Sequence, residues 1–508
     1  MPRTSVCREG YGTIGFKDPI ERVIERIATY VKVKKYMKKN TAEVPAELQM
    51  LLNANSSIVD FAMFEDSDTA RKKAQKDFIN GDTRVPNYQY PKLQNLYDTA
   101  DKGMPLSEKK TKTYEAVLEL EAQKKSGVLP EDLYELYASY HEVRLKKIML
   151  VEAAKRLHDE RGSAESVIAR EEFNYLNKEL YGEMDEKAFS AIMATESKMV
   201  EDFEPADKLS ARIKSELLDY FRQHKFEGTE KSKFSAKELA KLREAIDRRY
   251  SHSLSPIPET PDDKYYTATE CATIMTDCLF AGGLADEGWG CEVNPAKSNP
   301  TTNSTNKMIY LPTSTRRNAA ELRRLYLHEG EVHARRARNG EMTGLVPLEN
   351  GTANYADVEE GLGVILEIIE SGSFSTSPAY ARARDRYIMA GLALGTDGVP
   401  KDGRAAYEIM WRILALREAV DGKLTEVGIA KAKQQALVHD DNAFRGTNFA
   451  MPGVVYSKLK VYYEGLVKNL AYFRQNIDNV DEALDIAMLG KYDHTDQHER
   501  RHVRKLVM

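Results

Sequence analysis

Apolar residues recur at spacings of three and four along nearly the whole chain, and this period is that of an α-helix rather than a β-strand. The segment 134–157 shows it clearly, because its apolar positions follow one helical stripe. One short segment, residues 307–312 (KMIYLP), has the pattern of a strand: it is apolar, contains β-branched and aromatic side chains, and is bounded by turn residues. The sequence therefore predicts a mainly α fold with a small β-sheet (α+β).

The chain has 508 residues, which is too long for one ordinary hydrophobic core, so we expect two or more packed units. We expect an N-terminal helical region over 1–160, a central unit over 161–480, and a basic C-terminal tail over 481–508. Segments rich in Gly, Pro and Asn predict loops at 79–91, 251–263 and 288–306. The last of these is long, and a long loop without structure of its own is usually functional or mobile.

The charge balance excludes some classes of function. Lys and Arg number 74 and Asp and Glu number 79, giving a net charge of −5, which argues against a nucleic-acid binder held by a general positive field. No apolar run approaches the roughly 18 to 20 residues of a membrane helix, and the first residues lack an apolar signal segment. Four cysteines are too few for a disulfide framework. We therefore expect a cytoplasmic protein with neither nucleic acid nor membrane as a partner.

A histidine pair carries the strongest chemical signal. It lies in a predicted helix over 313–340 that begins at hydroxyl residues and ends at an Asn-Gly pair. In the familiar H-E-x-x-H pattern, a spacing of four places both imidazoles on one helical face, with the glutamate beside the metal. Here His333 follows His328 by five residues, with Glu329 between them. On an ideal α-helix that spacing leaves the side chains roughly 140° apart. A π-bulge of one residue would restore the alignment, and Gly330 would help the backbone to distort.

A second helix offers a third ligand. The segment 357–370 (DVEEGLGVILEIIE) predicts an amphipathic helix whose apolar face must be buried. Its burial carries Glu359 and Glu360 towards the interior, where unpaired carboxylates are costly and a metal would compensate. This is the layout of zinc peptidases that take a glutamate from a second helix. Acidic residues are also favoured at a helix N-terminus by the macrodipole alone, and the spacing does not choose between the two glutamates.

Together, LHEGEVHARRARNG and the downstream EEGL resemble the tyrosine carboxypeptidase family, a group of zinc peptidases marked by H-E-x-x-x-H. Further short motifs follow in the family's order, so the likeness extends from about residue 80 to about residue 470. They are PNYQYP at 86–91, LYG at 180–182, FRG at 444–446, YSK at 456–458 and YYEG at 462–465.

The resemblance implies a zincin-like metallopeptidase core with one zinc ion per chain. Its motif makes His328 and His333 zinc ligands, Glu360 the third ligand, and Glu329 the general base. The implied activity is removal of a C-terminal aromatic residue, Tyr or Phe, from a peptide or protein substrate.

Three departures from the family pattern leave these zinc ligands in place but put substrate preference in doubt. The family's I-G-T between the histidines is GEV at 330–332, its Thr before the EEG is Val358, and the Asp of its K-D is Leu459.

A carboxypeptidase also needs groups that hold the substrate. Cations suit its terminal carboxylate, and our candidates are Arg445 and Lys458. Tyr463 and Tyr456 are possible oxyanion donors, although buried tyrosines of this kind are more often core residues. The strand that starts at Lys307 could pair with an extended substrate backbone.

Three other interpretations remain open from the sequence. The same zinc ligands would serve an endopeptidase or an aminopeptidase, since they do not determine which end of the substrate is held. A non-catalytic helical interaction protein is an alternative of another class. Finally, His494, His498 and His502 are spaced at four on a predicted C-terminal helix, which is a conceivable second metal site.

Overall fold

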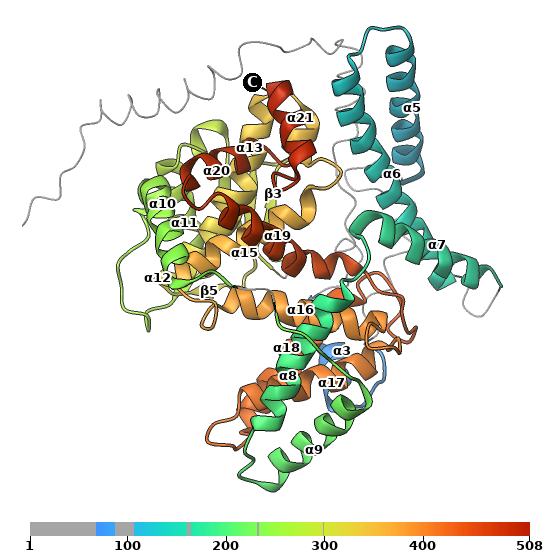
Figure 1. The fold of residues 1–508 in the computed structure, drawn as a ribbon, viewed down its shortest axis with the longest axis vertical. Helices are drawn as coiled ribbons and strands as arrows, with labels where there is room; N and C mark the ends of the chain where they lie inside the picture. The colour runs from blue at the N-terminus through green and yellow to red at the C-terminus, as the bar shows by residue number, and fades with distance from the viewer. Residues whose placement is uncertain (1–67, 87–105, 160–163, 231–232, 298, 508) are drawn as a thin grey trace, which may run out of the picture.

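The computed structural model describes residues 68–86, 106–159, 164–230, 233–297 and 299–507 (Figure 1). Residues 87–91 of the PNYQYP motif and Cys7 lie outside these ranges. Within them the fold is mainly α with small sheets, as predicted. The zincin-like core and the division at residues 160 and 480 stay predictions.

The N-terminal helices α5, α6 and α7 pack on one another in sequence at one side of the molecule (Figure 1). Their bounds are Leu106–Lys125, Glu131–Asp159 and Ala164–Tyr181. Leu106, Leu157 and Phe173 form a small core that also takes in Val454 from the C-terminal half of the chain. The shorter helix α3 (Asp68–Asn80) lies against α18.

Helices α8, α9, α17 and α18 pack together in a second group, drawn at the lower end of Figure 1. Their bounds are Glu186–Asp202, Lys208–Gln223, Gly403–Arg417 and Glu426–Ala443. This group shares one continuous hydrophobic core with the central helices. The central and remaining helices are α10 (Ala236–Leu254), α11 (Ala268–Ala281), α14 (Val346–Asn350), α15 (Tyr355–Ser371), α16 (Pro378–Leu394), α19 (Val461–Gln475), α20 (Val480–Ala487) and α21 (Gln497–Val507).

The predicted strand is confirmed as β4 (Met308–Leu311), the middle strand of a three-stranded sheet ordered β2-β4-β3. β2 (Gly290–Val293) runs parallel to it and β3 (Thr301–Asn303) antiparallel. The prediction of an unstructured loop over 288–306 is therefore wrong, because both outer strands lie within it. They are too short and too polar to show an alternating pattern of their own. A second, two-stranded sheet pairs β1 (Tyr266–Thr267) with β5 (Arg316–Arg317).

The predicted helix over 313–340 consists of three consecutive segments. They are α12 (Ala319–Tyr326), a π-helix η4 (Leu327–Ala334) and α13 (Arg335–Met342). The N-cap is Asn318, which exchanges capping hydrogen bonds with Glu321, so the expected cap among the hydroxyl residues from Thr313 is wrong. The helix also continues beyond the predicted Asn-Gly stop. Gly344, with φ of 71°, supplies the left-handed turn after it.

Helices α15 and α19 cross at two facing glycines. A Cβ on Gly361 would lie 2.0 Å from the backbone of Gly465, and a Cβ on Gly465 would lie 1.6 Å from the carbonyl oxygen of Asp357. Only glycine permits this approach, which explains why both the EEG and the YYEG motifs contain one. None of the described helices is long and apolar enough to cross a membrane.

We expect Gly465→Ala to lower the free energy of unfolding by about 3 kcal/mol or more, because the added methyl group forces two backbones apart. Urea denaturation of the purified protein measures this change. Gly428→Ala is the matched control, since the nearest atom to its Cβ is a side-chain oxygen at 3.1 Å. Equal stability of the two variants would contradict the proposed constraint on the α15–α19 crossing.

Candidate metal centre and active site

The histidine pair lies on the π-helical segment η4 (Leu327–Ala334). A π-helix bonds residue i to residue i+5, so side chains five residues apart fall on the same face. The rings of His328 and His333 accordingly lie with their centroids 4.9 Å apart. The local departure from α-helical bonding that the five-residue spacing predicted is therefore present, and it spans more than a single bulged residue.

Gly330 is required at this place by packing. A Cβ on Gly330 would lie 2.7 Å from the ring of Tyr326, which is fully buried against the helix backbone. The hydroxyl of Tyr326 donates to the carbonyl oxygen of Cys278 at 3.0 Å, which fixes the ring in position. The absence of a side chain at Gly330 thus lets a buried aromatic ring pack directly against the π-helical turn.

Each histidine is oriented by a carboxylate from α15. Nδ1 of His328 lies 2.8 Å from Oε1 of Glu367, and Nδ1 of His333 lies 2.8 Å from Oε1 of Glu359. A carboxylate only accepts hydrogen bonds, so each Nδ1 carries a hydrogen and each Nε2 is the nitrogen that faces the candidate metal position. Carboxylates placed in this way are the usual orienting partners of metal-binding histidines. Gly363 makes room for the arrangement, because a Cβ there would lie 2.6 Å from the His328 ring.

Glu360 faces the two Nε2 atoms. Its Oε2 lies 3.7 Å from Nε2 of His328 and 3.8 Å from Nε2 of His333. Two ligand atoms that are each about 2 Å from one tetrahedral ion lie roughly 3.3 Å apart, so these three atoms are close to the spacing that a zinc ion needs. The structure thereby separates the two glutamates that the spacing left equivalent. Glu360 points towards the ligand atoms, while Glu359 binds the far side of an imidazole.

Glu329 completes the group. It offers a carboxylate oxygen that lies, with the ligand atoms of His328 and His333, in a cluster no more than 4.8 Å across. The hydroxyl of Thr302, on β3, donates to Oε2 of Glu329 at 2.6 Å and to its backbone oxygen at 3.1 Å. The sheet thus orients the glutamate that the motif suggests as the base. Sequence reasoning missed Thr302 because the polar run around it has no recognisable pattern.

The carboxylates favour positive charge at this site. Burial opposes the charged form of His328, but Glu360 and Glu367 outweigh it and raise the pKa of the imidazole to about 10. Burial would likewise raise the pKa of Glu360, yet His328, His333 and Lys458 hold it well below its ordinary value. A dication is the kind of ligand that such an electrostatic environment prefers, and its binding would displace the proton from the imidazole.

A buried arginine supports Glu359 from the C-terminal segment. The fully buried Arg336 donates to Oε2 of Glu359 at 2.7 Å and to the carbonyl oxygens of Gly490 and Tyr492 at 2.9 and 2.7 Å. Nζ of Lys491 lies 3.4 Å from the same carboxylate. Burial alone would raise the pKa of Glu359, but Lys491, Arg336 and His333 lower it to about 2. Residues 490–492 therefore help to hold His333 through Glu359.

The expected substrate residues fall in different places. Lys458 lies in the short 3-10 helix η5 (Ser457–Lys460), close enough to lower the pKa of Glu360. Arg445 lies half-buried in the turn after α18. Nζ of Lys307 donates to Oε1 of Glu341 at 2.7 Å and to the carbonyl oxygen of Glu287 at 3.2 Å, so these two groups hold its side chain. The roles of Arg445 and Lys458 stay predictions.

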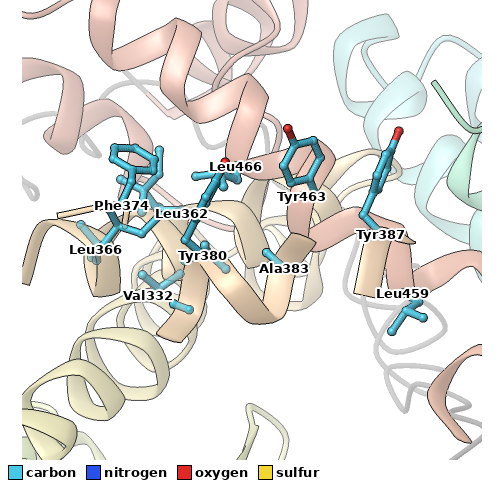
Figure 2. Close-up of a cluster of buried hydrophobic side chains, with 14 of the residues drawn as sticks. Val332, Leu362, Leu366, Phe374, Tyr380, Ala383, Tyr387, Leu459, Tyr463 and Leu466 are labelled. Atoms are coloured by element: carbon cyan, nitrogen blue, oxygen red, sulfur yellow. The ribbon is translucent and has the colours of Figure 1, made fainter. Parts of the chain in front are cut away.

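The two tyrosines of the YYEG motif face different surroundings. Tyr463 is buried in the hydrophobic core, with its ring 4.8 Å from that of Tyr387 (Figure 2). Tyr462 is the one near the candidate site, since burial and the charges of Glu360 and Glu329 raise the pKa of its hydroxyl. Of the two, Tyr463 is therefore a core residue, as buried tyrosines usually are. Tyr456 lies with its hydroxyl 3.2 Å from that of Tyr181.

Two further expectations need correction. The strand β4 is already paired on both sides, so β3 rather than β4 is the outer strand next to Glu329. The three C-terminal histidines do not form one face, because His494 is fully buried with Nε2 3.0 Å from Oδ1 of Asn469. It precedes α21 (Gln497–Val507), which holds His498 and His502. The spacing of four does not place the three histidines on one helical face, because the helix begins only after His494.

Comparison with protein families supports the assignment made from the motifs. Residues 209–383 match the family described as microtubule-associated tyrosine carboxypeptidase. This span contains both histidines, Glu329 and Glu360, whereas the FRG and YYEG motifs lie beyond it. Comparison with curated proteins and with solved structures gave no match. The resemblance is confirmed for the segment that carries the candidate site.

We expect Arg336→Leu to lower the free energy of unfolding by about 3 to 5 kcal/mol, because it removes one partner of a buried ion pair and leaves two carbonyl oxygens without a donor. Urea denaturation measures the loss. Arg248→Leu is the control: Arg248 forms exposed pairs with Glu244 and Asp481, and we expect little change. A loss no greater than that of the control would show that Arg336 does not support Glu359.

Proposed function

Residues 209–383 carry a domain of the tyrosine carboxypeptidase family, and we propose that the protein is a zinc-dependent carboxypeptidase. Its substrate would be a peptide or protein C-terminus, from which it removes an aromatic residue, Tyr or Phe. The observation that carries the proposal is the convergence of the two Nε2 atoms and Oε2 of Glu360, all within the matched segment.

His328, His333 and Glu360 would hold the zinc ion, and their two nitrogens and one carboxylate oxygen suit zinc better than calcium or magnesium. With three protein ligands, a bound zinc ion would keep one position open and would supply activation of water and polarisation of the substrate carbonyl. Glu359 and Glu367 would keep both imidazoles in the tautomer that this requires.

Glu329 would act as the general base. Its carboxylate takes a proton from the attacking water and returns it to the nitrogen of the leaving amino acid. The hydrogen bond from Thr302 fixes one carboxylate oxygen, so the other is presented in a constant direction. Thr302 is thus a positioning residue for this step.

The strand β3 would pair with the substrate backbone. It is an outer strand of its sheet, and Thr302 on it touches Glu329, so an extended peptide added there would run past the base. Lys458, whose charge lowers the pKa of Glu360, would supply a cation near the carboxylate end of such a substrate. These placements support a peptide as substrate, in agreement with the family's description.

We expect one zinc ion per chain in the wild-type protein and none in His333→Ala, measured by elemental analysis after dialysis. Glu360→Gln should lose zinc, whereas Glu359→Gln should keep it with an affinity lowered about 10- to 100-fold, as for other orienting carboxylates. Zinc loss in Glu359→Gln together with full retention in Glu360→Gln would reverse the assignment of the third ligand.

We expect Glu329→Gln to keep zinc and fold but to lose hydrolysis of a Tyr-terminated peptide by at least about a hundredfold, because the amide preserves the shape and removes the base. Mass spectrometry of the products measures the rate. Glu292→Gln, at an exposed position on β2, is the control and should act as wild type. Activity of Glu329→Gln within about tenfold of wild type would exclude it as the proton acceptor. Products cut from the interior would move the assignment to an endopeptidase.

A further inference from the structure

Helix α16 places an arginine beside the candidate site. Arg386 is half-buried on α16, which packs against α15, α19 and η5. Its guanidinium carbon lies 4.0 Å from the centre of the Tyr462 ring. Tyr462 lies one helical turn before Gly465 on α19, and the backbone of Gly465 contacts Gly361, the neighbour of Glu360 on α15. The charges of Glu360 and Glu329 accordingly act on the Tyr462 hydroxyl. Arg386 therefore lies beside the candidate metal centre, stacked on the ring of Tyr462.

Arg386 differs from the other arginines of its helix. Arg382 binds Oε2 of Glu367 at 3.0 Å, and Arg384 binds Glu196 and Glu230 at 2.8 and 2.7 Å. Among the residues that the structure describes, none forms an ion pair with Arg386. Its guanidinium is thus available to an anion from outside the chain. Stacking on Tyr462 occupies its face and leaves the hydrogen-bond donors in its plane available.

Two other groups point to the same place. Lys458 lies on η5, directly before the start of α19 that holds Tyr462, and its charge acts on both Glu360 and Tyr462. The hydroxyl of Tyr462 is itself a donor. A planar guanidinium, an ammonium and a phenol form a set of donors that suits a single carboxylate.

The position fits the chemistry of an exopeptidase. In a C-terminal residue, three bonds separate the scissile carbonyl carbon from the carboxylate carbon, so the two lie only about 3 to 4 Å apart. A group that holds the carboxylate must therefore lie next to the metal ligands. Tyr462 is placed to do so, because its end of α19 lies against α15 at Gly361, next to Glu360.

We propose that Arg386, together with Lys458 and Tyr462, binds the α-carboxylate of the residue to be removed. The inference rests on the proposed function, and it assigns to Arg386 a role for which the sequence had suggested Arg445. Arg386 is then the residue that restricts cleavage to a free C-terminus.

The test measures binding rather than hydrolysis. The zinc-loaded Glu329→Gln protein is titrated calorimetrically with a peptide ending in free Tyr and with the same peptide as its C-terminal amide. We expect the acid to bind at least about tenfold more tightly than the amide, and Arg386→Ala in this background to weaken the acid by about 10- to 100-fold while changing the amide little. Arg386→Lys should give an intermediate loss, because it keeps the charge and removes the planar fork.

Arg412→Ala in the same background is the matched control, since Arg412 also stacks on an aromatic ring, that of Trp411, but on α17. It should leave both affinities unchanged. If Arg386→Ala unfolds at a lower temperature than its parent, Arg386→Gln replaces it, because glutamine retains a polar side chain without the charge.

Equal binding of acid and amide by the parent, or a preference for the acid that survives both Arg386 variants, would overturn the proposal. Failure of the proposed function is recognised separately, because it would appear as absent zinc or as an intact Tyr-terminated peptide after incubation with the wild-type enzyme. Hydrolysis of the Tyr-terminated peptide by the zinc-loaded wild-type enzyme, together with an acid preference that stays intact in Arg386→Ala, would thus count against the role of Arg386 and leave the proposed function standing.

Discussion

His328 and His333 can face the same ion only because the backbone between them bonds from residue i to residue i+5. This register is uncommon in proteins, so its surroundings must favour it over an ordinary α-helix. The ring of Tyr326 packs against Gly330 on one side, and the hydroxyl of Thr302 binds the backbone oxygen of Glu329 on another. The core and the sheet thus meet at the π-helical turn, and both contribute to the geometry of the candidate site.

The geometry of the candidate site also depends on charged and polar groups near the C-terminal end of the chain. Glu359 orients His333 and is itself held by Arg336 and Lys491, while Arg336 also binds the carbonyl oxygens of Gly490 and Tyr492. Tyr492 belongs to the small core that packs α21 (Gln497–Val507) against α6 (Glu131–Asp159). A C-terminal segment that the sequence suggested to be a basic tail therefore helps to hold His333, a candidate metal ligand, in position.

Sequence reasoning reached the site because its central residues lie in two short, contiguous motifs. The five-residue spacing of the histidines required a distortion of the helix, and the apolar pattern of α15 required its glutamates to be buried. The supporting residues could not be found in this way. Thr302, Arg336 and Arg386 acquire their roles only through contacts with residues distant in the chain, and neither the polar composition of β3 nor the frequent arginines of α13 and α16 distinguish them. The choice between Glu359 and Glu360 likewise depended on which way each side chain points.

The structure also bears on the departures from the family's motif. Between the histidines, Glu331 is fully buried and paired with Arg335. Val332 belongs to the same hydrophobic core as Leu362 (Figure 2).

Val358 is fully buried, and its backbone oxygen accepts a hydrogen bond from Asn469 at 2.9 Å. Leu459, where the family has Asp, is buried in the same core (Figure 2). The sequence alone suggested that these exchanges bear on substrate preference. Because these residues are buried, the exchanges alter the packing behind the site and not a surface that touches substrate. Residues that set substrate preference by direct contact are therefore expected on β3, on η5 and on the face of α16 that holds Arg386.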